Sequence, residues 1–122
     1  MSNDWHSNAP IYRQLKERIV TMLLDGTLQP GDALPSVRQI AADFQLNPIT
    51  VSRAYQELVD EQLVETKRGL GMFVLAGARE KLLKSERTRF LKEEWPAVLE
   101  RINQLGFSVA ELPSTVKTGN KK

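Results

Sequence analysis

The stretch LNPITVSRAYQEL, residues 46–58, decides the fold because it combines a helix start with a helical apolar face. Asn47 is a favoured residue just before a helix, and Pro48 suits the first helical position. At about 100° per residue, one side of such a helix gathers residues for burial. These are Val51, Ala54, Tyr55, Leu58 and Gln62. The other side carries Ile49, Arg53 and Gln56, with Thr50 and Glu57 beside them. A helix over about 48–62 with an exposed, capped front end is predicted.

Two more helices are predicted before this stretch. Residues 10–25 carry apolar side chains at helical spacing, and Gly26 is placed to end that helix. Ser36 is placed to cap a second helix, whose apolar residues are Val37, Ile40, Ala41 and Phe44. The short FQLN segment between the second and third helices forces a sharp turn. Two short helices joined in this way form a helix-turn-helix.

A β-hairpin is predicted after the third helix. Residues 63–66 and 72–75 are rich in apolar and β-branched side chains, and they flank the segment KRGLG, whose two glycines permit a tight turn. Lys67 and Arg68 are expected on the tip of this hairpin. A hairpin that follows a helix-turn-helix is a wing, so residues 1–77 are predicted to form a winged helix-turn-helix domain, mainly α with a small β-hairpin.

Residues 78–112 are predicted to form a short helical extension. Its apolar residues recur at helical spacing as Leu91, Trp95, Val98, Leu99, Ile102 and Leu105. Pro96 lies inside this pattern, and it either kinks one long helix or begins a second one. Little chain follows to cover the stripe, so we expect it to be a dimer interface. Residues 113–122 read as a disordered tail.

Composition excludes several classes of protein. The 122 residues include no cysteine and a single histidine, His6, which we expect to be solvated, so no metal or cofactor is expected. There is no nucleophile–His–carboxylate set and no phosphate-binding glycine loop before a helix, which argues against an enzyme. No apolar run is long enough to span a bilayer, and no secretory signal is visible at the N-terminus. A cytoplasmic protein without a membrane partner is expected.

The charge is distributed unevenly. Residues 1–78 hold seven Lys/Arg against nine Asp/Glu, and residues 79–122 hold ten against six. Proteins that bind nucleic acids usually carry a basic stripe, so the acidic first part favours an alternative, a winged-helix module for protein–protein interaction. Arg53 on the third helix and Arg68 on the wing favour DNA instead, because they lie on the two elements that would face it.

Residues 10–75 resemble the winged helix-turn-helix of the GntR family of bacterial transcription regulators. The motifs are Pro30-Gly31, Leu34-Pro35-Ser36 with Arg38, Thr50-Val51 with Arg53, and the ending Gly69-x-Gly71-x-Phe-Val. The remaining chain is too short for a large effector domain and resembles the dimerising extension of the YtrA-like subfamily. In that subfamily the recognition helix often opens Asn-Pro-Asn-Thr. Here Ile49 replaces the second Asn, and Pro48 stands where many other relatives carry an Arg.

The resemblance implies a homodimeric repressor that binds a palindromic operator in double-stranded DNA, with an unidentified small-molecule effector left open. An α-helix fits the major groove, and helix N-termini attract phosphate. The predicted DNA contacts are Ser36, Arg38, Asn47, Ile49, Thr50, Arg53, Lys67, Arg68 and Gly69. Several alternatives stay open at this point, one being that Thr50 only supports the capped first turn of its helix. Arg53 would otherwise pair with Glu57, and Ile49 would otherwise pack on Phe44 or Leu46.

Overall fold

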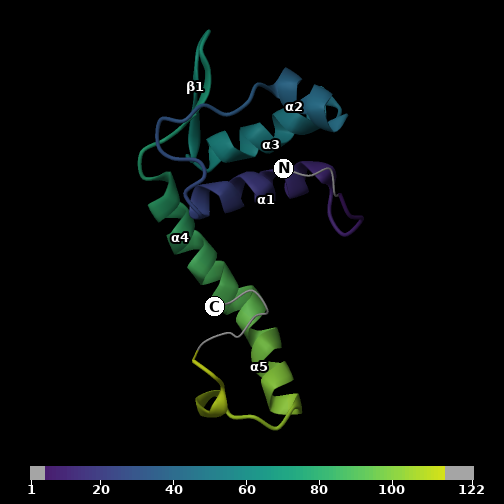
Figure 1. Cartoon of the computed structure of the whole chain (residues 1–122), viewed down its shortest axis with the longest axis vertical. Coiled ribbons are helices and arrows are strands. Elements are labelled where there is room, and N and C mark those ends of the chain that lie inside the picture. The colour runs from purple at the N-terminus through teal and green to yellow at the C-terminus, as the bar shows by residue number, and fades with distance from the viewer. Residues whose placement is uncertain (1–4, 115–122) are drawn as a thin grey trace, which may run out of the picture. The chain divides into compact units, whose positions relative to one another are not determined.

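The computed structural model describes residues 5–114, and the chain divides into two compact units, Met1–Ser85 and Glu86–Lys122. Figure 1 shows the elements in chain order. They are α1 (Ile11–Leu24), α2 (Val37–Phe44), α3 (Pro48–Asp60), β1 (Val64–Lys67), β2 (Gly71–Val74), α4 (Ala78–Arg89), the π-helical turn η1 (Phe90–Glu94), α5 (Trp95–Gln104) and the 3-10 turn η2 (Val109–Glu111). The predicted class, mainly α with one small hairpin, is confirmed.

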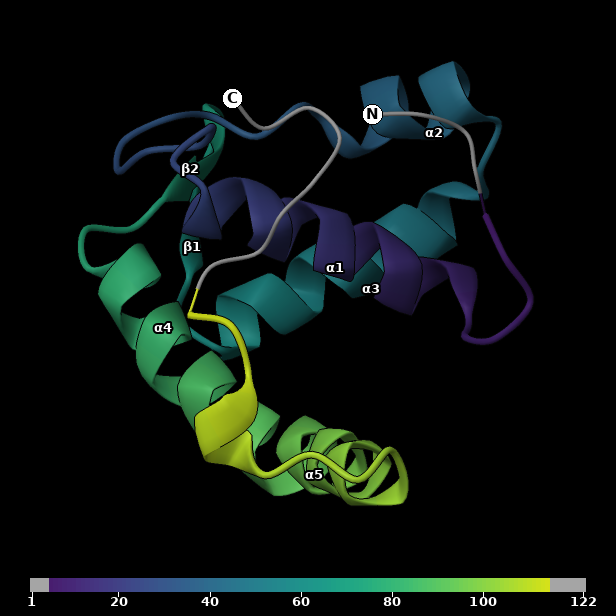
Figure 2. The same cartoon turned by 60° about the horizontal axis from the view of Figure 1, so that its bottom comes forward.

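The core of the first unit lies between α1, α2 and α3. Helix α1 packs along α3, as Figure 2 shows. Leu15, Val51 and Leu58 have no exposed surface at all, and the α3 face predicted from the sequence is buried. The prediction that Gln62 shares this buried face is wrong. Helix α3 ends at Asp60, and Gln62 follows it in a left-handed conformation with its side chain exposed.

Local hydrogen bonds set the turn between α2 and α3. The Ser36 hydroxyl accepts from the amide of Gln39 at 3.0 Å, and the Asn47 side chain accepts from the amide of Ile49 at 2.9 Å. Both predicted N-caps are therefore present. Gln45 takes a positive φ of 55°, which closes α2 and reverses the chain. The Leu46 amide then donates to the carbonyl of Ala41 at 2.9 Å.

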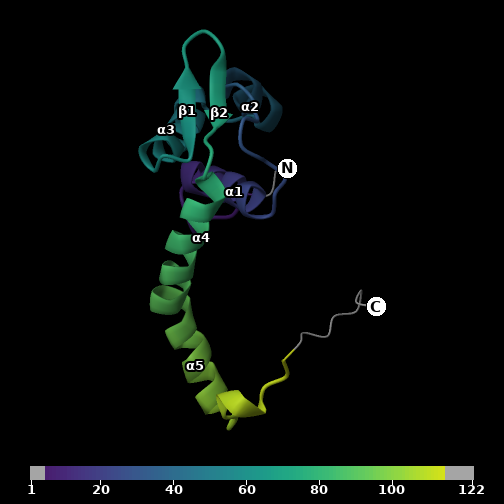
Figure 3. The ribbon, with the colours of Figure 1, turned by 90° about the vertical axis from the view of Figure 1, so that its left-hand side faces the viewer.

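The hairpin is antiparallel, with Val64 opposite Val74 and Lys67 opposite Gly71. It projects past the helices in Figures 1 and 3. Its tip is residues 68–70, where Gly69 takes a φ of 77° that a glycine adopts at no steric cost. The structure corrects the predicted position of Lys67, which is the last residue of β1 and not part of the tip.

Residues 31–34 form a third row beside β2. The amides of Gly31 and Leu34 donate to the carbonyls of Val74 and Met72, each at 2.8 Å, and the Val74 amide donates to Asp32 at 2.9 Å. We call residues 31–34 together with β2 the wing strip. It leads directly into α2, so backbone hydrogen bonds join the wing to the start of that helix.

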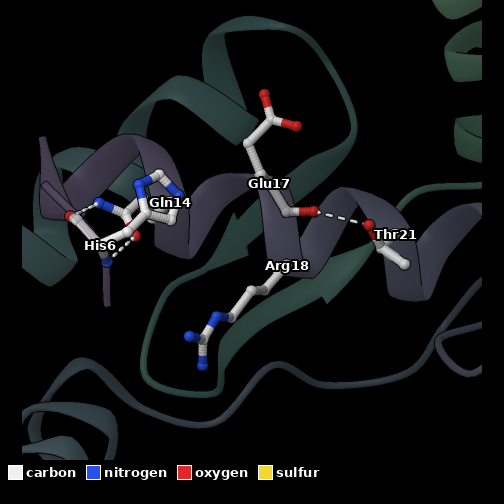
Figure 4. Close-up of a pocket in the computed structure, with 5 residues that line it drawn as sticks. All are labelled: His6, Gln14, Glu17, Arg18 and Thr21. Atoms are coloured by element: carbon white, nitrogen blue, oxygen red, sulfur yellow. Dashed lines mark hydrogen bonds between the residues drawn. The ribbon is translucent and has the colours of Figure 1, made fainter. Parts of the chain in front are cut away.

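A buried glutamine fastens the N-terminal segment to α1. The Gln14 side-chain amide donates to the carbonyls of His6 and Ala9, at 2.7 and 2.6 Å, and its oxygen accepts from the His6 amide at 3.0 Å. Figure 4 shows these His6 bonds beside a hollow of about 210 Å³, whose lining residues are His6, Gln14, Glu17, Arg18 and Thr21. The imidazole of His6 is exposed, and its Nδ1 accepts from the Asn8 amide.

The first turns of α4 belong to the first unit, because Ala78 and Leu82 are buried in its core. Pro96 lies in the first turn of α5, and the turn before it is π-helical, with the Trp95 amide donating to Phe90 five residues back. A proline ring clashes with the carbonyl four residues earlier, and a widened π turn accommodates it. A second helix thus begins at Trp95, joined to the first without a loop.

No helix within residues 5–114 is long and apolar enough to cross a membrane. Of the tail predicted over residues 113–122, residues 115–122 lie outside the described part of the chain.

Candidate nucleic-acid interface

The residues predicted to contact DNA lie on three elements of the first unit. Ser36 and Arg38 lie at the start of α2. The second group lies at and after the N-cap of α3, namely Asn47, Ile49, Thr50 and Arg53. The third group lies on the hairpin, namely Lys67, Arg68 and Gly69. Thr50 is half-buried and all the others are exposed.

Two arginines lie on this surface without a partner among the residues that the structure describes. Arg38 lies in the first turn of α2, and Arg68 lies on the hairpin tip. Neither guanidinium makes an ion pair, hydrogen bond or ring contact within residues 5–114. Both are therefore available to phosphate or to a base edge, since an Arg presents five donors in a fixed fork.

Ile49 is 77% exposed. Phe44 and Leu46 are partly buried against the core, and Ile49 is not part of that cluster. The alternative in which Ile49 packs on those two residues is therefore wrong. An exposed Ile at the front of a recognition helix is able to contact the methyl group of thymine, the one apolar mark in the major groove.

Arg53 does not pair with Glu57, so that alternative is also wrong. The Glu57 carboxylate accepts from Lys16 of α1 at 3.3 Å. The guanidinium of Arg53 instead lies over the ring of Tyr12, 3.9 Å from the ring centroid. This contact joins the predicted recognition helix to the start of α1. The spacing of residues within either segment does not predict it.

The two cations of the hairpin differ in position. The Lys67 ammonium lies 4.9 Å from the centroid of the Phe73 ring and 4.0 Å from the Glu65 carboxylate. Its side chain therefore lies beside residues of the two strands and not at the tip. Arg68 lies on the tip beside Leu70, which is 73% exposed. The sequence motifs predict no role for Leu70, although an apolar residue between two turn glycines is an unusual choice for a solvated tip.

Further polar residues of α3 share the exposed side with Ile49 and Arg53. Ser52 and Gln56 are exposed, and helical spacing places both within about 60° of Ile49. The Gln56 side-chain amide donates to Asp60 at 2.9 Å. Ser52 is absent from the predicted DNA contacts because those contacts were chosen mainly by positive charge. The 100° projection already contained the signal.

A hollow of about 290 Å³ lies between the wing and the start of α2. Its lining residues are Leu34, Pro35, Ser36, Val37, Tyr55, Leu70, Gly71 and Met72. The Tyr55 hydroxyl donates to the carbonyl of Pro35 at 2.7 Å. Burial raises the pKa of Tyr55 to about 12, so the phenol stays neutral at physiological pH and acts as a hydrogen-bond donor.

The predicted dimer stripe is largely exposed within the extension. Leu91 and Leu105 are 62% and 54% exposed, Val98 is also exposed, and Trp95 and Leu99 are half-buried. Ile102 is only 8% exposed in one copy, so it serves mainly the packing of the extension itself. Three exposed residues were not included in the predicted stripe, namely Phe90, Phe107 and Val109.

Comparison with known proteins agrees with this geometry. Residues 11–74 match the family described as "Bacterial regulatory proteins, gntR family". The HTH-type transcriptional repressor YtrA of Bacillus subtilis is 35% identical over 93% of this chain and 87% of its own length. The uncharacterized HTH-type transcriptional regulator YhcF of the same organism is 33% identical over 97% and 96%.

One solved structure is similar to this one. The crystal structure of a transcriptional regulator from Oenococcus oeni has a TM-score of 0.72 at 30% identity, over 86% of each chain. These relatives are regulators and not enzymes. With its exposed α3 and its hairpin wing, the chain belongs to the GntR family and is a DNA-binding transcription regulator.

Proposed function

We propose that this protein is a homodimeric repressor that acts in the cytoplasm on a palindromic operator. The observation that carries the proposal is the exposed apolar stripe of the extension, since Leu91, Val98 and Leu105 leave a face that a second copy of the chain would cover. The repressor function is inferred from YtrA of Bacillus subtilis, which is named a transcriptional repressor.

In this proposal the front of α3 enters the major groove. Ile49 and Arg53 would contact base edges, while Asn47 and Thr50 would fix the helix against the backbone. Ser36 and Arg38 at the start of α2 would bind phosphates in one stretch of the DNA backbone, because the free amides of a helix N-terminus favour an anion. The wing, with Lys67, Arg68 and Gly69, would reach the flanking backbone or the minor groove.

Binding in this arrangement needs no metal ion and no cofactor, and repression would be steric. A dimer that occupies a promoter excludes RNA polymerase from it. Two of the acidic groups on α3 and just after it, Glu57 and Glu61, are engaged by the Lys16 ammonium, which offsets part of their negative charge.

Selection of bound sequences from random duplex DNA with the purified full-length protein tests the proposal. We expect an inverted repeat whose half-sites are separated by about 10 base pairs, or a multiple of that distance, as the helical repeat requires. Affinity should fall steeply with salt concentration, because phosphate contacts release counterions. Enrichment of a single unrepeated motif would contradict the dimer. Absence of salt-dependent DNA binding would favour the protein-interaction module instead.

A further inference from the structure

Two contacts between α1 and α3 lie one helical turn apart on both helices. Tyr12 lies under the guanidinium of Arg53, with the ring centroid 3.9 Å from Cζ. Lys16, four residues later in α1, donates to Glu57, four residues later in α3, at 3.3 Å. Residues four apart on a helix are neighbours on one face. The two contacts therefore form consecutive rungs between the same two helices.

The Lys16–Glu57 contact bears on which partner the Arg53 guanidinium has. Arg53 and Glu57 are themselves four residues apart, the spacing at which an arginine and a carboxylate pair along a helix. That pairing would turn the guanidinium along α3 and occupy its donors. Lys16 holds both Glu57 and Glu61, and its own side chain is only 17% exposed. Glu57 is thus engaged by α1 and does not compete for Arg53.

Electrostatics agree with this geometry. Burial lowers the pKa of Lys16, but the hydrogen bonds and charges of Glu61 and Glu57 outweigh burial, so the pKa lies above the ordinary 10.5. Lys16 is therefore a permanent cation at physiological pH, and its hold on Glu57 does not vary there.

Within residues 5–114 no hydrogen bond or ion pair occupies the N–H groups of Arg53, whose Cζ lies 3.9 Å from the Tyr12 ring centroid. A guanidinium stacked on an aromatic ring interacts through its flat face, so the N–H groups around its edge remain able to bind acceptors. The stack also restricts a long side chain that would otherwise sample many rotamers, which lowers the entropy lost when it contacts DNA. A stacked arginine is prepared for two parallel bonds to a base edge or phosphate.

We propose that Tyr12 and Lys16 are positioning residues for DNA recognition, in which Tyr12 holds the Arg53 guanidinium in place and Lys16 keeps Glu57 away from it. The proposal rests on the role of Arg53 proposed above. Neither Tyr12 nor Lys16 has to touch DNA.

Variants of Lys16 give the sharpest test. Lys16→Met keeps the length of the side chain but frees Glu57 to pair with Arg53. We expect operator affinity to fall roughly tenfold, with the loss concentrated at one operator position, as for a base-reading arginine. Adding Glu57→Gln should restore affinity and base preference, because a neutral amide does not hold the guanidinium. Adding Glu61→Gln changes the net charge equally but leaves Glu57 charged, so it should not restore them.

Direct contact of Lys16 with phosphate predicts a different pattern. Lys16→Met would then weaken all sequences alike, and both second changes would raise affinity by the same general charge effect. That pattern would overturn the proposal. Thermal unfolding of each variant separates these outcomes from a loss of the fold.

Variants of Tyr12 give an independent test. Tyr12→Phe keeps the ring and should bind like the wild type, whereas Tyr12→Leu should lose discrimination at the same operator position as Arg53→Ala. Combining Tyr12→Leu with Arg53→Ala should add little to the loss. If Arg53→Ala itself binds like the wild type, the role of Arg53 in the proposed function fails. If Arg53→Ala binds weakly while Tyr12→Leu and Lys16→Met bind normally, the positioning proposal alone is overturned.

Discussion

Tyr55 of α3 donates its hydroxyl hydrogen to the carbonyl oxygen of Pro35, 2.7 Å away. Tyr55 is 3% exposed, and Pro35 immediately precedes the cap of α2. A single side chain thus ties α3, the proposed recognition helix, to the segment that precedes α2. Because the phenol is buried, its pKa rises to about 12.

The first prediction concerns alkaline pH. The folded protein holds the Tyr55 proton more tightly than the unfolded chain, whose pKa is about 10. This contribution to stability is therefore complete below pH 10 and is lost as pH rises through about 12, a change on the order of 2 kcal/mol. Tyr55→Phe should cost about 1 kcal/mol at neutral pH and should flatten this alkaline loss.

Chemical denaturation from pH 8 to 12 measures the effect. Tyr12→Phe is the control, because it removes the hydroxyl of the other tyrosine, which lies partly exposed on α1. An unchanged alkaline loss in Tyr55→Phe would contradict the assignment.

The second prediction distinguishes the role of Arg38 from that of Arg68. Arg38→Ala removes a cation at the start of α2 and should weaken binding to all sequences alike while reducing the salt dependence by about one unit of slope. Arg68→Ala should remove a contact made by the wing, so the loss of operator affinity should depend on the base sequence that flanks each half-site. Fluorescence anisotropy with operator and scrambled DNA over a salt series distinguishes the two. Arg87→Ala on α4 is the matched control, and operator binding equal to the wild type in both test variants would refute this surface.

The third prediction concerns Ile49. Since this side chain is 77% exposed, Ile49→Asn should leave the melting temperature nearly unchanged. The preferred base at one operator position should change, away from a T·A pair and toward an adenine that an Asn would bind through two hydrogen bonds. Parallel selections with both proteins check this. A lower melting temperature with an unchanged selected sequence would show that Ile49 has a structural role only.

The fourth prediction concerns the extension. Val98 lies on the exposed apolar stripe, and Ala97, its neighbour, points about 100° away on α5. Val98→Lys should shift the protein from dimer to monomer in sedimentation and weaken operator binding by the loss of the second half-site. Ala97→Lys introduces the same charge on the side of α5 that lies away from the apolar stripe and should leave the dimer intact. Equal behaviour of the two variants would place the interface elsewhere.

Sequence reasoning succeeded where the determinants are local. The caps by Ser36 and Asn47, the buried side of α3 and the glycine turn of the wing depend on neighbouring residues, and all are present. Gln62 was misplaced because the helical projection was continued past the point where the chain leaves the helix. The π turn before Pro96 is one of two ways to relieve the same clash, and spacing alone does not choose between them.

The contacts that position the candidate site were not predictable in the same way. Lys16 and Glu57 are 41 residues apart in the chain, and their pairing depends on how α1 packs on α3. The sequence offered the nearer pair, Arg53 with Glu57, because only spacing within one helix was visible. The exposure of Ile49 is likewise a tertiary property, since it depends on which side of the turn faces the core.

The wing strip has a consequence for how such regulators diverge. Its bonds join backbone atoms of residues 31–34 to β2, so they do not depend on the identity of most side chains around them. Arg68 and Leu70 are exposed residues of the hairpin turn that precedes β2. Substitution at these positions leaves the wing strip intact and costs little folding stability. If the wing contacts DNA as proposed, a duplicated copy of the gene would therefore acquire a new operator preference through a few surface changes, with the fold needing no compensating mutation.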